Sequence, residues 1–105
     1  MRTTSTTMLL SAGDCWPLEL ARALAATGNV TVVLLDRAAD LARPTHPSQP
    51  RVQAALGAGA TVMVDSAALQ RRGIHPTAVA TGIKPSDIAA VGDLLVDATD
   101  KVVWL

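Results

Sequence analysis

The sequence predicts an α/β domain with three layers (α/β/α), in which helices cover both faces of a mainly parallel β-sheet. Segments rich in β-branched and aliphatic residues alternate along the chain with segments whose apolar residues recur at helical spacing. The strand-like runs are apolar almost throughout, which is typical of parallel strands that are covered on both faces. With 105 residues, the chain has the length of a single domain, 1–105.

The first third of the chain predicts two strands joined by a helix. The apolar run 6–12 predicts the first strand. Residues 16–27 carry apolar side chains at helical spacing, with Pro17 suited to the first turn and Gly28 following as a stop signal. The run 30–35 is continuously apolar or β-branched and predicts a second strand that is covered on both faces.

The middle of the chain predicts a loop, a helix and a third strand. Residues 36–42 are expected to form a turn or a short helix. The segment 43–50 is rich in proline and predicts a mobile loop. Residues 52–56 have helix character and are followed by two glycines, and the run 61–64 predicts the third strand.

The last third predicts two helices and two strands. We expect a helix over 65–72, with Asp65 or Ser66 as its cap and a glycine as its stop. The segment 75–84 is expected to be irregular, with a short edge strand near 78–80. A helix is predicted from Pro85 to about residue 98, and a final strand over 101–105.

Composition and charge exclude several classes of function. The net charge is zero and only 2% of residues are aromatic, which argues against binding to nucleic acid through phosphate neutralisation or base stacking. The chain contains no apolar run that approaches a membrane span or a signal segment, and its single cysteine favours a reducing compartment. We therefore expect a soluble, cytoplasmic protein. A core of small aliphatic side chains gains little from burial per residue, which favours a homo-oligomer.

Ligands of parallel sheets bind outside the carboxyl ends of the strands, so the loops there contain the candidate functional residues. Asp14, Cys15 and Trp16 follow the first predicted strand, and Asp65 and Ser66 follow the third. Near a helix N-terminus the dipole favours a thiolate, so Cys15 is a candidate nucleophile or sulfur carrier. A small, half-buried side chain without reactivity is the alternative for this residue. Trp16 is expected to act as a lid or a subunit contact.

The sequence does not predict a metal site or a cofactor. His46 and His75 each precede a proline, and neither has a partner at metal-ligand spacing. The acidic residues that could face one rim do not form the adjacent pair that a phospho-acceptor site requires. The neighbouring Arg71 and Arg72 are most simply a favourable charge pair at a helix C-terminus, and they are also candidates for binding an anionic partner.

Residues 62–74, VMVDSAALQRRGI, resemble the DsrE/DsrF/DsrH superfamily in having a strand, a short helix, an Arg-Gly pair and an apolar residue. The ending 97–105, DATDKVVWL, looks like the closing acidic helix end and Asp-Lys-Val strand of that family. The resemblance implies a flavodoxin-like sandwich that assembles as trimers or hexamers. It also implies a sulfur-relay role, in which a cysteine at the end of the strand before the Arg-Gly helix carries persulfide sulfur. The corresponding position here is Asp65.

A carboxylate at this position cannot hold a persulfide, and three interpretations follow. The chain is a non-catalytic or diverged paralogue that binds a partner or a small ligand, or Cys15 has taken over the thiol role and exchanges sulfur with a relay partner. In the third interpretation, Asp65 is an acid, base or charged binding group in an unrelated reaction. The candidate ligand-facing residues are Asp14, Trp16, Asp65 and Ser66, and the candidate catalytic residues are Cys15 and Asp65.

Overall fold

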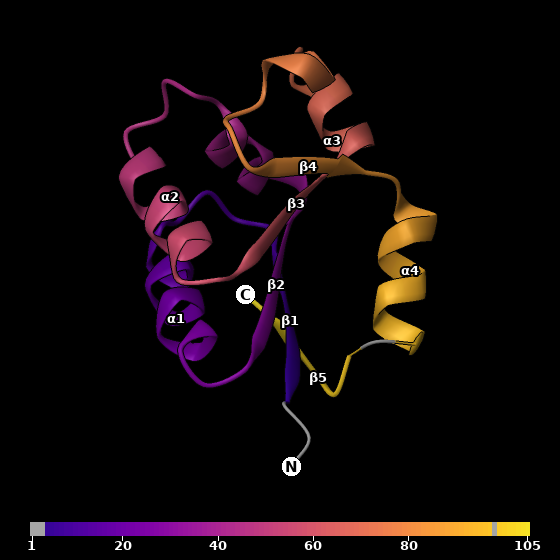
Figure 1. The fold of residues 1–105 in the computed structure, drawn as a ribbon. Helices are drawn as coiled ribbons and strands as arrows, with labels where there is room; N and C mark the ends of the chain where they lie inside the picture. The colour runs from indigo at the N-terminus through magenta and orange to yellow at the C-terminus, as the bar shows by residue number, and fades with distance from the viewer. Residues whose placement is uncertain (1–3, 98) are drawn as a thin grey trace.

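The computed structural model describes residues 4–97 and 99–105, and within them five strands form one sheet in the order β4-β3-β2-β1-β5 (Figure 1). The strands are β1 (Ser5–Leu10), β2 (Asn29–Leu34), β3 (Thr61–Asp65), β4 (Ile83–Ser86) and β5 (Lys101–Trp104). Every pairing between neighbouring strands is parallel. The predicted α/β class with a parallel sheet is therefore confirmed.

Helices cover both faces of this sheet, so the predicted three-layer arrangement is also confirmed. The α-helices are α1 (Trp16–Ala25), α2 (Gln49–Gly57), α3 (Ser66–Arg71) and α4 (Ile88–Asp97), and the 3₁₀ segments are η1 (Asp36–Ala42) and η2 (Pro76–Ala78). Helices α1 and α2 lie on one side of the sheet and α4 lies on the other (Figure 1). Among the described residues, no helix is long and apolar enough to cross a membrane.

The strand order explains why α4 lies alone on its face. The chain steps from β1 through β2 and β3 to β4 in one direction, and β5 then returns to the far side of β1. Connections between parallel strands are right-handed, so a reversal of direction places the connecting helix on the opposite face. The helix α4 makes this returning connection and covers the face that α1 and α2 leave open.

Alternating side chains of the strands supply two separate apolar cores. The larger core lies under α1 and α2 and includes Met8, Val32 and Val62, which are fully buried. The smaller core lies under α4 and consists of Leu9, Val33 and Val91, with half-buried neighbours. The side-chain period of a strand is two residues, so consecutive residues of β1 and β2 enter opposite cores.

The edge strand after α3 lies further along the chain than the sequence predicts. The predicted strand near 78–80 is wrong, because Pro76–Ala78 form η2 and the strand β4 is Ile83–Ser86. Pro85 lies inside β4 and does not start the predicted helix. A proline is tolerated there because β4 is an edge strand, which pairs on one side only. The missing backbone N–H of the proline therefore interrupts no central strand.

The first residues of α4 and α2 differ from the predicted ones, because side chains there make hydrogen bonds that sequence periodicity does not reveal. The helix α4 begins at Ile88, and Asp87 Oδ1 accepts a hydrogen bond from the backbone N–H of Ala90 at 2.8 Å. The helix α2 begins at Gln49, inside the segment that was predicted to be a loop. The buried Gln49 side chain donates from Nε2 to the carbonyl of Leu41 at 2.7 Å, which ties the start of α2 to η1.

Candidate functional site

The carboxyl edge of the sheet brings together the loops that follow β1, β2 and β3. The loop after β1 passes close to the start of η1, since a Cβ added at Gly13 would lie 4.0 Å from the carbonyl oxygen of Arg37. Leu35, directly after β2, donates its backbone N–H to the carbonyl of Leu10 at 2.8 Å. Parallel sheets bind ligands at this edge, so these loops form the frame of a candidate site.

Cys15 is the N-cap residue of α1, and its thiol is half-buried against the larger core. The carbonyl of Cys15 accepts the backbone N–H of Leu18 at 3.1 Å, which closes the first turn of the helix. The flanking side chains of Asp14 and Trp16 are exposed. The thiol therefore packs against apolar side chains while its neighbours on both sides face outward.

Asp65 and Ser66 mark the junction of β3 and α3. Asp65 is the last residue of β3, pairs with Ser86 of β4, and is the N-cap residue of α3. Its neighbour Val64 is fully buried in the larger core. Since side chains alternate along a strand, the half-buried carboxylate of Asp65 lies on the α4 side of the sheet.

The structure keeps these two groups of predicted site residues apart. Asp14, Cys15 and Trp16 follow β1, while Asp65 and Ser66 lie at the end of β3, and β2 runs between the two strands. Neighbouring strands are about 4.8 Å apart, so β1 and β3 are separated by about 10 Å. The thiol of Cys15 packs on the α1 side of the sheet, and Asp65 lies on the other side.

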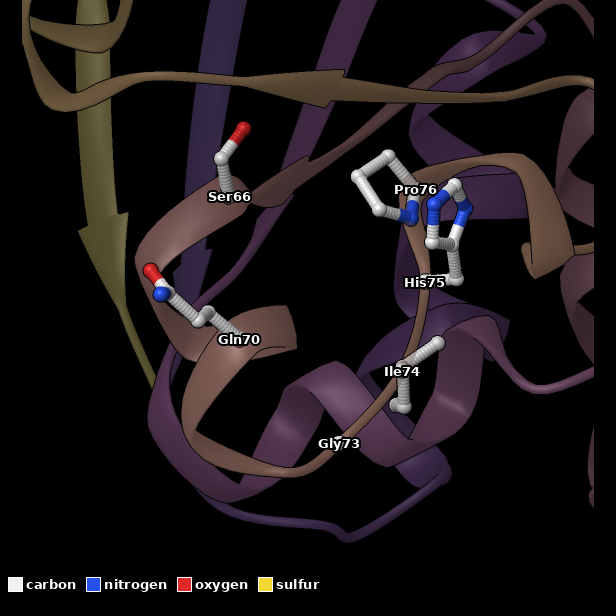
Figure 2. A pocket seen from close by; sticks show the side chains of 6 residues that line it. All are labelled: Ser66, Gln70, Gly73, Ile74, His75 and Pro76. Atoms are coloured by element: carbon white, nitrogen blue, oxygen red, sulfur yellow. The ribbon is translucent and has the colours of Figure 1, made fainter.

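A cavity of about 470 Å³ lies beside α3 and begins at Ser66 (Figure 2). Its lining residues are Ser66, Gln70, Gly73, Ile74, His75 and Pro76. Ser66 and Gln70 project from α3, while His75 and Pro76 belong to the segment that follows it (Figure 2). The cavity thus lies between the short helix and the chain that leaves it.

The turn after α3 creates this cavity. Gly73 has a φ of 68°, a left-handed conformation that glycine adopts readily and other residues adopt only with strain. The turn allows Ile74 to donate its backbone N–H to the carbonyl of Leu69 at 2.9 Å, and it buries the side chain of Ile74. From the sequence, Gly73 is predicted only as the stop of the helix over 65–72. The sequence signal for this turn is Gly73 itself, because a glycine after the two arginines permits the left-handed turn that brings Gln70 and His75 to one cavity.

The hydrogen bonds of His75 determine what its ring offers the cavity. Nδ1 of His75 accepts the backbone N–H of Thr77 at 3.2 Å and lies 2.7 Å from Thr77 Oγ1. Because Nδ1 acts as an acceptor, the neutral ring carries its proton on Nε2 and is a donor there. Ser66 and Gln70 each provide a donor and an acceptor. The lining contains no carboxylate, ammonium or guanidinium group.

The described residues do not form a metal centre. Within 4–97 and 99–105, no group of three or more His, Cys, Asp or Glu side chains is placed to hold a metal ion. His46 is engaged locally, with Nδ1 accepting the backbone N–H of Ser48 at 3.0 Å. The side chains that line the cavity beside α3 offer hydrogen bonding and apolar contact.

Comparison of the whole fold with solved structures finds proteins of the same architecture. The ychN protein from E. coli matches with a TM-score of 0.83 and 16% identity, over 99% of this chain and 100% of that protein. The protein of unknown function MTH1491 from Methanobacterium thermoautotrophicum matches with a TM-score of 0.82 and 12% identity, over 97% and 99% of the two chains. The chain therefore has the DsrE-like fold. No protein-family model matches the sequence, and no curated protein matches it either.

Proposed function

We propose that the chain is a diverged protein of the DsrE/F type that binds a small ligand or a protein partner. The observation that carries this proposal is the cavity of about 470 Å³ that begins at Ser66, directly after Asp65. Asp65 occupies the position at which the resemblance expects a sulfur-carrying cysteine. The carboxylate there cannot form a sulfur–sulfur bond, whereas the neighbouring cavity can still accept a ligand.

The lining of the cavity favours a neutral ligand with an apolar part. Ile74 and Pro76 supply apolar surface, and Ser66, Gln70 and His75 supply hydrogen-bonding groups without a fixed charge. Small-molecule sites commonly have volumes of about 300–1,000 Å³ and combine apolar walls with a few polar groups. This cavity matches that description in volume and in composition.

A fragment screen by NMR tests the proposal. The probes are neutral molecules, each with one apolar ring and one amide or hydroxyl group, added to the full chain labelled with ¹⁵N. We expect shifts at the backbone amides of Ser66, Gln70 and His75. The variant Ser66→Leu fills the cavity mouth and should abolish these shifts.

The matched control is Ser5→Leu, because Ser5 is also half-buried but lies at the amino end of β1, at the opposite edge of the sheet. Fragment binding should be unchanged in this variant. If the fragments shift no amide around α3, or if both variants lose binding equally, the cavity is not the ligand site and the proposal fails.

Sulfur transfer through Cys15 is the alternative function. The half-buried thiol is the N-cap residue of α1 and lies at the carboxyl edge of the sheet. In the required step, the Cys15 thiolate attacks the outer sulfur of a persulfide R–S–SH. A bond forms between the Cys15 sulfur and the outer sulfur, the sulfur–sulfur bond of the donor breaks, and R–S⁻ leaves and takes up a proton to become R–SH.

Mass spectrometry after exposure to a persulfide donor separates this alternative from ligand binding. A gain of one sulfur atom on Cys15, absent in Cys15→Ser, would support the transfer reaction. If the thiol stays unmodified while fragments bind beside α3, ligand binding stands alone. An inert thiol should also react slowly with an alkylating reagent under native conditions.

Homo-oligomer formation is a further part of the proposal, with a trimer or hexamer as the resemblance implies. Exposed apolar side chains gather on β5 and α4: Val102, Trp104, Ile88 and Val96. Isolated exposed apolar residues are ordinary, but several on adjoining elements favour an interaction surface. A reducing, cytoplasmic location fits the single free cysteine and belongs to the same proposal.

A further inference from the structure

A second cavity, of about 380 Å³, lies between the start of η1 and the end of α3 and has a different chemistry. Its lining residues are Asp36, Arg43, Arg71 and Arg72. Asp36 begins η1 one residue after Leu35, so the cavity lies at the carboxyl end of β2, where parallel sheets bind ligands. We use the name arginine cluster for Arg43, Arg71 and Arg72.

Asp40 holds two guanidinium groups of the arginine cluster in place. Its Oδ1 lies 3.2 Å from Nε of Arg43, and its Oδ2 lies 3.0 Å from Nη1 of Arg72. Both oxygens of one carboxylate are therefore engaged, each by a different arginine. Charge-assisted hydrogen bonds of this kind fix the orientation of a guanidinium plane, so these two groups are ordered before any ligand arrives.

Two backbone carbonyls complete this support. Arg43 donates from Nη2 to the carbonyl of Arg72 at 3.1 Å, and Arg72 donates from Nε to the carbonyl of Asp36 at 3.1 Å. The first of these bonds satisfies a carbonyl at the C-terminal end of α3, where the helix dipole would otherwise repel an anion. A guanidinium carries more N–H donors than these contacts use, so donors remain for a ligand.

Asp36 has a strained backbone at this site. Its φ is 46°, and it is the only residue other than glycine with a positive φ among the described residues. Aspartate and asparagine tolerate this conformation better than most side chains. The strained turn presents the Asp36 carbonyl to Arg72, and its carboxylate lies 3.4 Å from Nη2 of Arg71.

The three guanidinium groups of the arginine cluster and the carboxylates of Asp36 and Asp40 together carry one excess positive charge, in a chain whose net charge is zero. We propose that the arginine cluster binds the phosphate group of a small phosphorylated molecule. A phosphate offers several acceptor oxygens in a tetrahedral arrangement, which several guanidinium groups can share, whereas a carboxylate offers only its pair of oxygens. The cavity exceeds what a bare anion needs, and its size is that of a small-molecule site.

NMR titration of the full chain with inorganic phosphate and with ribose 5-phosphate tests this site. Both probes carry the phosphate group, and plain ribose serves as the probe without it. Sodium chloride at equal ionic strength controls for screening of surface charge. We expect phosphate and ribose 5-phosphate to shift the amides of Asp36, Arg71 and Arg72, while ribose and chloride leave them unchanged. Tighter binding of ribose 5-phosphate would identify a phosphate ester as the ligand, and equal binding would identify free phosphate.

The variants Arg71→Gln and Arg22→Gln form a matched pair. The Arg71 side chain is 60% exposed and paired with Asp36, and the Arg22 side chain is 58% exposed and paired with Glu19 on α1, outside the cavity. Loss of one charged hydrogen-bond donor should raise the phosphate Kd about tenfold in Arg71→Gln. The Kd should remain unchanged in Arg22→Gln, because its charge lies elsewhere.

Asp36→Asn provides a variant that gains affinity. Asparagine also tolerates a positive φ, so the turn is kept while the negative charge beside Arg71 is removed. Phosphate should bind several-fold more tightly to this variant. This gain also tests the site if Arg71→Gln fails to fold.

Several outcomes would overturn the proposal. Equal shifts with chloride, equal loss of affinity in Arg22→Gln and Arg71→Gln, or no gain in Asp36→Asn would each exclude a phosphate site. Binding of a poly-glutamate peptide without binding of either phosphate compound would assign the cluster to an acidic protein partner instead. The fragment screen beside α3 uses a different cavity, so this proposal and the proposed function can fail independently.

Discussion

The two faces of the sheet differ in how completely the chain covers them. The face under α1 and α2 carries the larger core, whose strand residues Val32, Leu34 and Val62 are fully buried. The opposite face is covered by α4 alone, and its core of buried residues is Leu9, Val33 and Val91. One helix cannot cover five strands, because a helix with its side chains is about 10–12 Å wide and neighbouring strands are about 4.8 Å apart.

The consequence of this difference is visible on β5. In the pairing of β1 with β5, Val102 is the partner of Thr7 and Trp104 is the partner of Leu9. Both side chains therefore lie on the α4 face, yet both are exposed. On the other face, Val103 is half-buried against the larger core. The sheet thus has one well-covered face and one face on which β5 leaves apolar side chains exposed, which supports the proposed assembly with a second copy.

The largest expected effect is a loss of stability when the well-covered face is opened. Leu34→Ala removes a fully buried side chain from the larger core and should lower the free energy of unfolding by about 2–5 kcal/mol. Leu94→Ala removes a half-buried side chain of α4 that packs against the smaller core, and it should lower the free energy of unfolding clearly less. Urea unfolding of both variants at low protein concentration measures the difference. Equal losses would show that the two faces are equally well packed.

A smaller effect should follow from breaking the polar link between β1 and α4. Thr99 Oγ1 donates to the carbonyl of Leu94 at 3.0 Å, so in the 2.7 Å contact between the two hydroxyls the buried Thr7 is the donor. Thr7→Val should lower the free energy of unfolding by about 1 kcal/mol, because Thr99 Oγ1 loses the hydrogen bond that it accepts from Thr7.

The control for this prediction is Thr31→Val. Thr31 pairs with Thr7 in register on β2 and is half-buried. No side-chain hydrogen bond of Thr31 occurs in the described part of the chain, so its replacement should change stability by less than about 0.5 kcal/mol. A similar cost for both variants would mean that the Thr7–Thr99 bond contributes nothing specific.

The smallest effect on the stability of one chain should come from Trp104→Ala, although its effect on assembly should be large. Trp104 is 70% exposed, and its Nε1 donates to Ser11 Oγ at 3.4 Å. The free energy of unfolding of the separated chain should change by about 0.5 kcal/mol or less. The mass measured by analytical ultracentrifugation should fall toward that of one chain, 10.8 kDa.

Trp16→Ala tests the competing prediction that Trp16 is a subunit contact, since Trp16 is 56% exposed and lies at the start of α1, away from the α4 face. Its loss should leave the mass unchanged. If the wild-type chain already sediments at 10.8 kDa, or if Trp16→Ala dissociates the assembly while Trp104→Ala does not, the exposed edge of β5 is not the subunit contact.

Sequence periodicity predicted the strands that lie inside the sheet better than the strand β4 at its edge. The runs that became β1, β2 and β3 are apolar because the residues enter a core on each side. The strand β4 has the sequence IKPS, with an exposed lysine and proline, and it therefore has no apolar run to detect. Its place is determined by pairing with β3, from Val62 with Ile83 to Asp65 with Ser86.

In the candidate site, too, some features could be predicted from the sequence and others depend on packing between elements. The sequence identified Cys15, Asp65 and Ser66 through their places after strands, and the structure puts all three at strand or helix boundaries. Neither cavity was predicted, because each depends on contacts between segments that are distant in the chain. Arg43 and Arg72 converge on Asp40 only when α3 packs against η1.

The sequence by itself determined the class of the fold, since alternating apolar strands and amphipathic helices can bury their surfaces together only in a layered α/β domain. It also determined that a carboxylate stands at the end of β3. Only the tertiary structure decided that Cys15 and Asp65 lie on opposite faces of the sheet, and that three arginines surround one cavity. The physical reason is that side-chain patterns record local burial, whereas the position of a loop depends on packing between elements far apart in the chain.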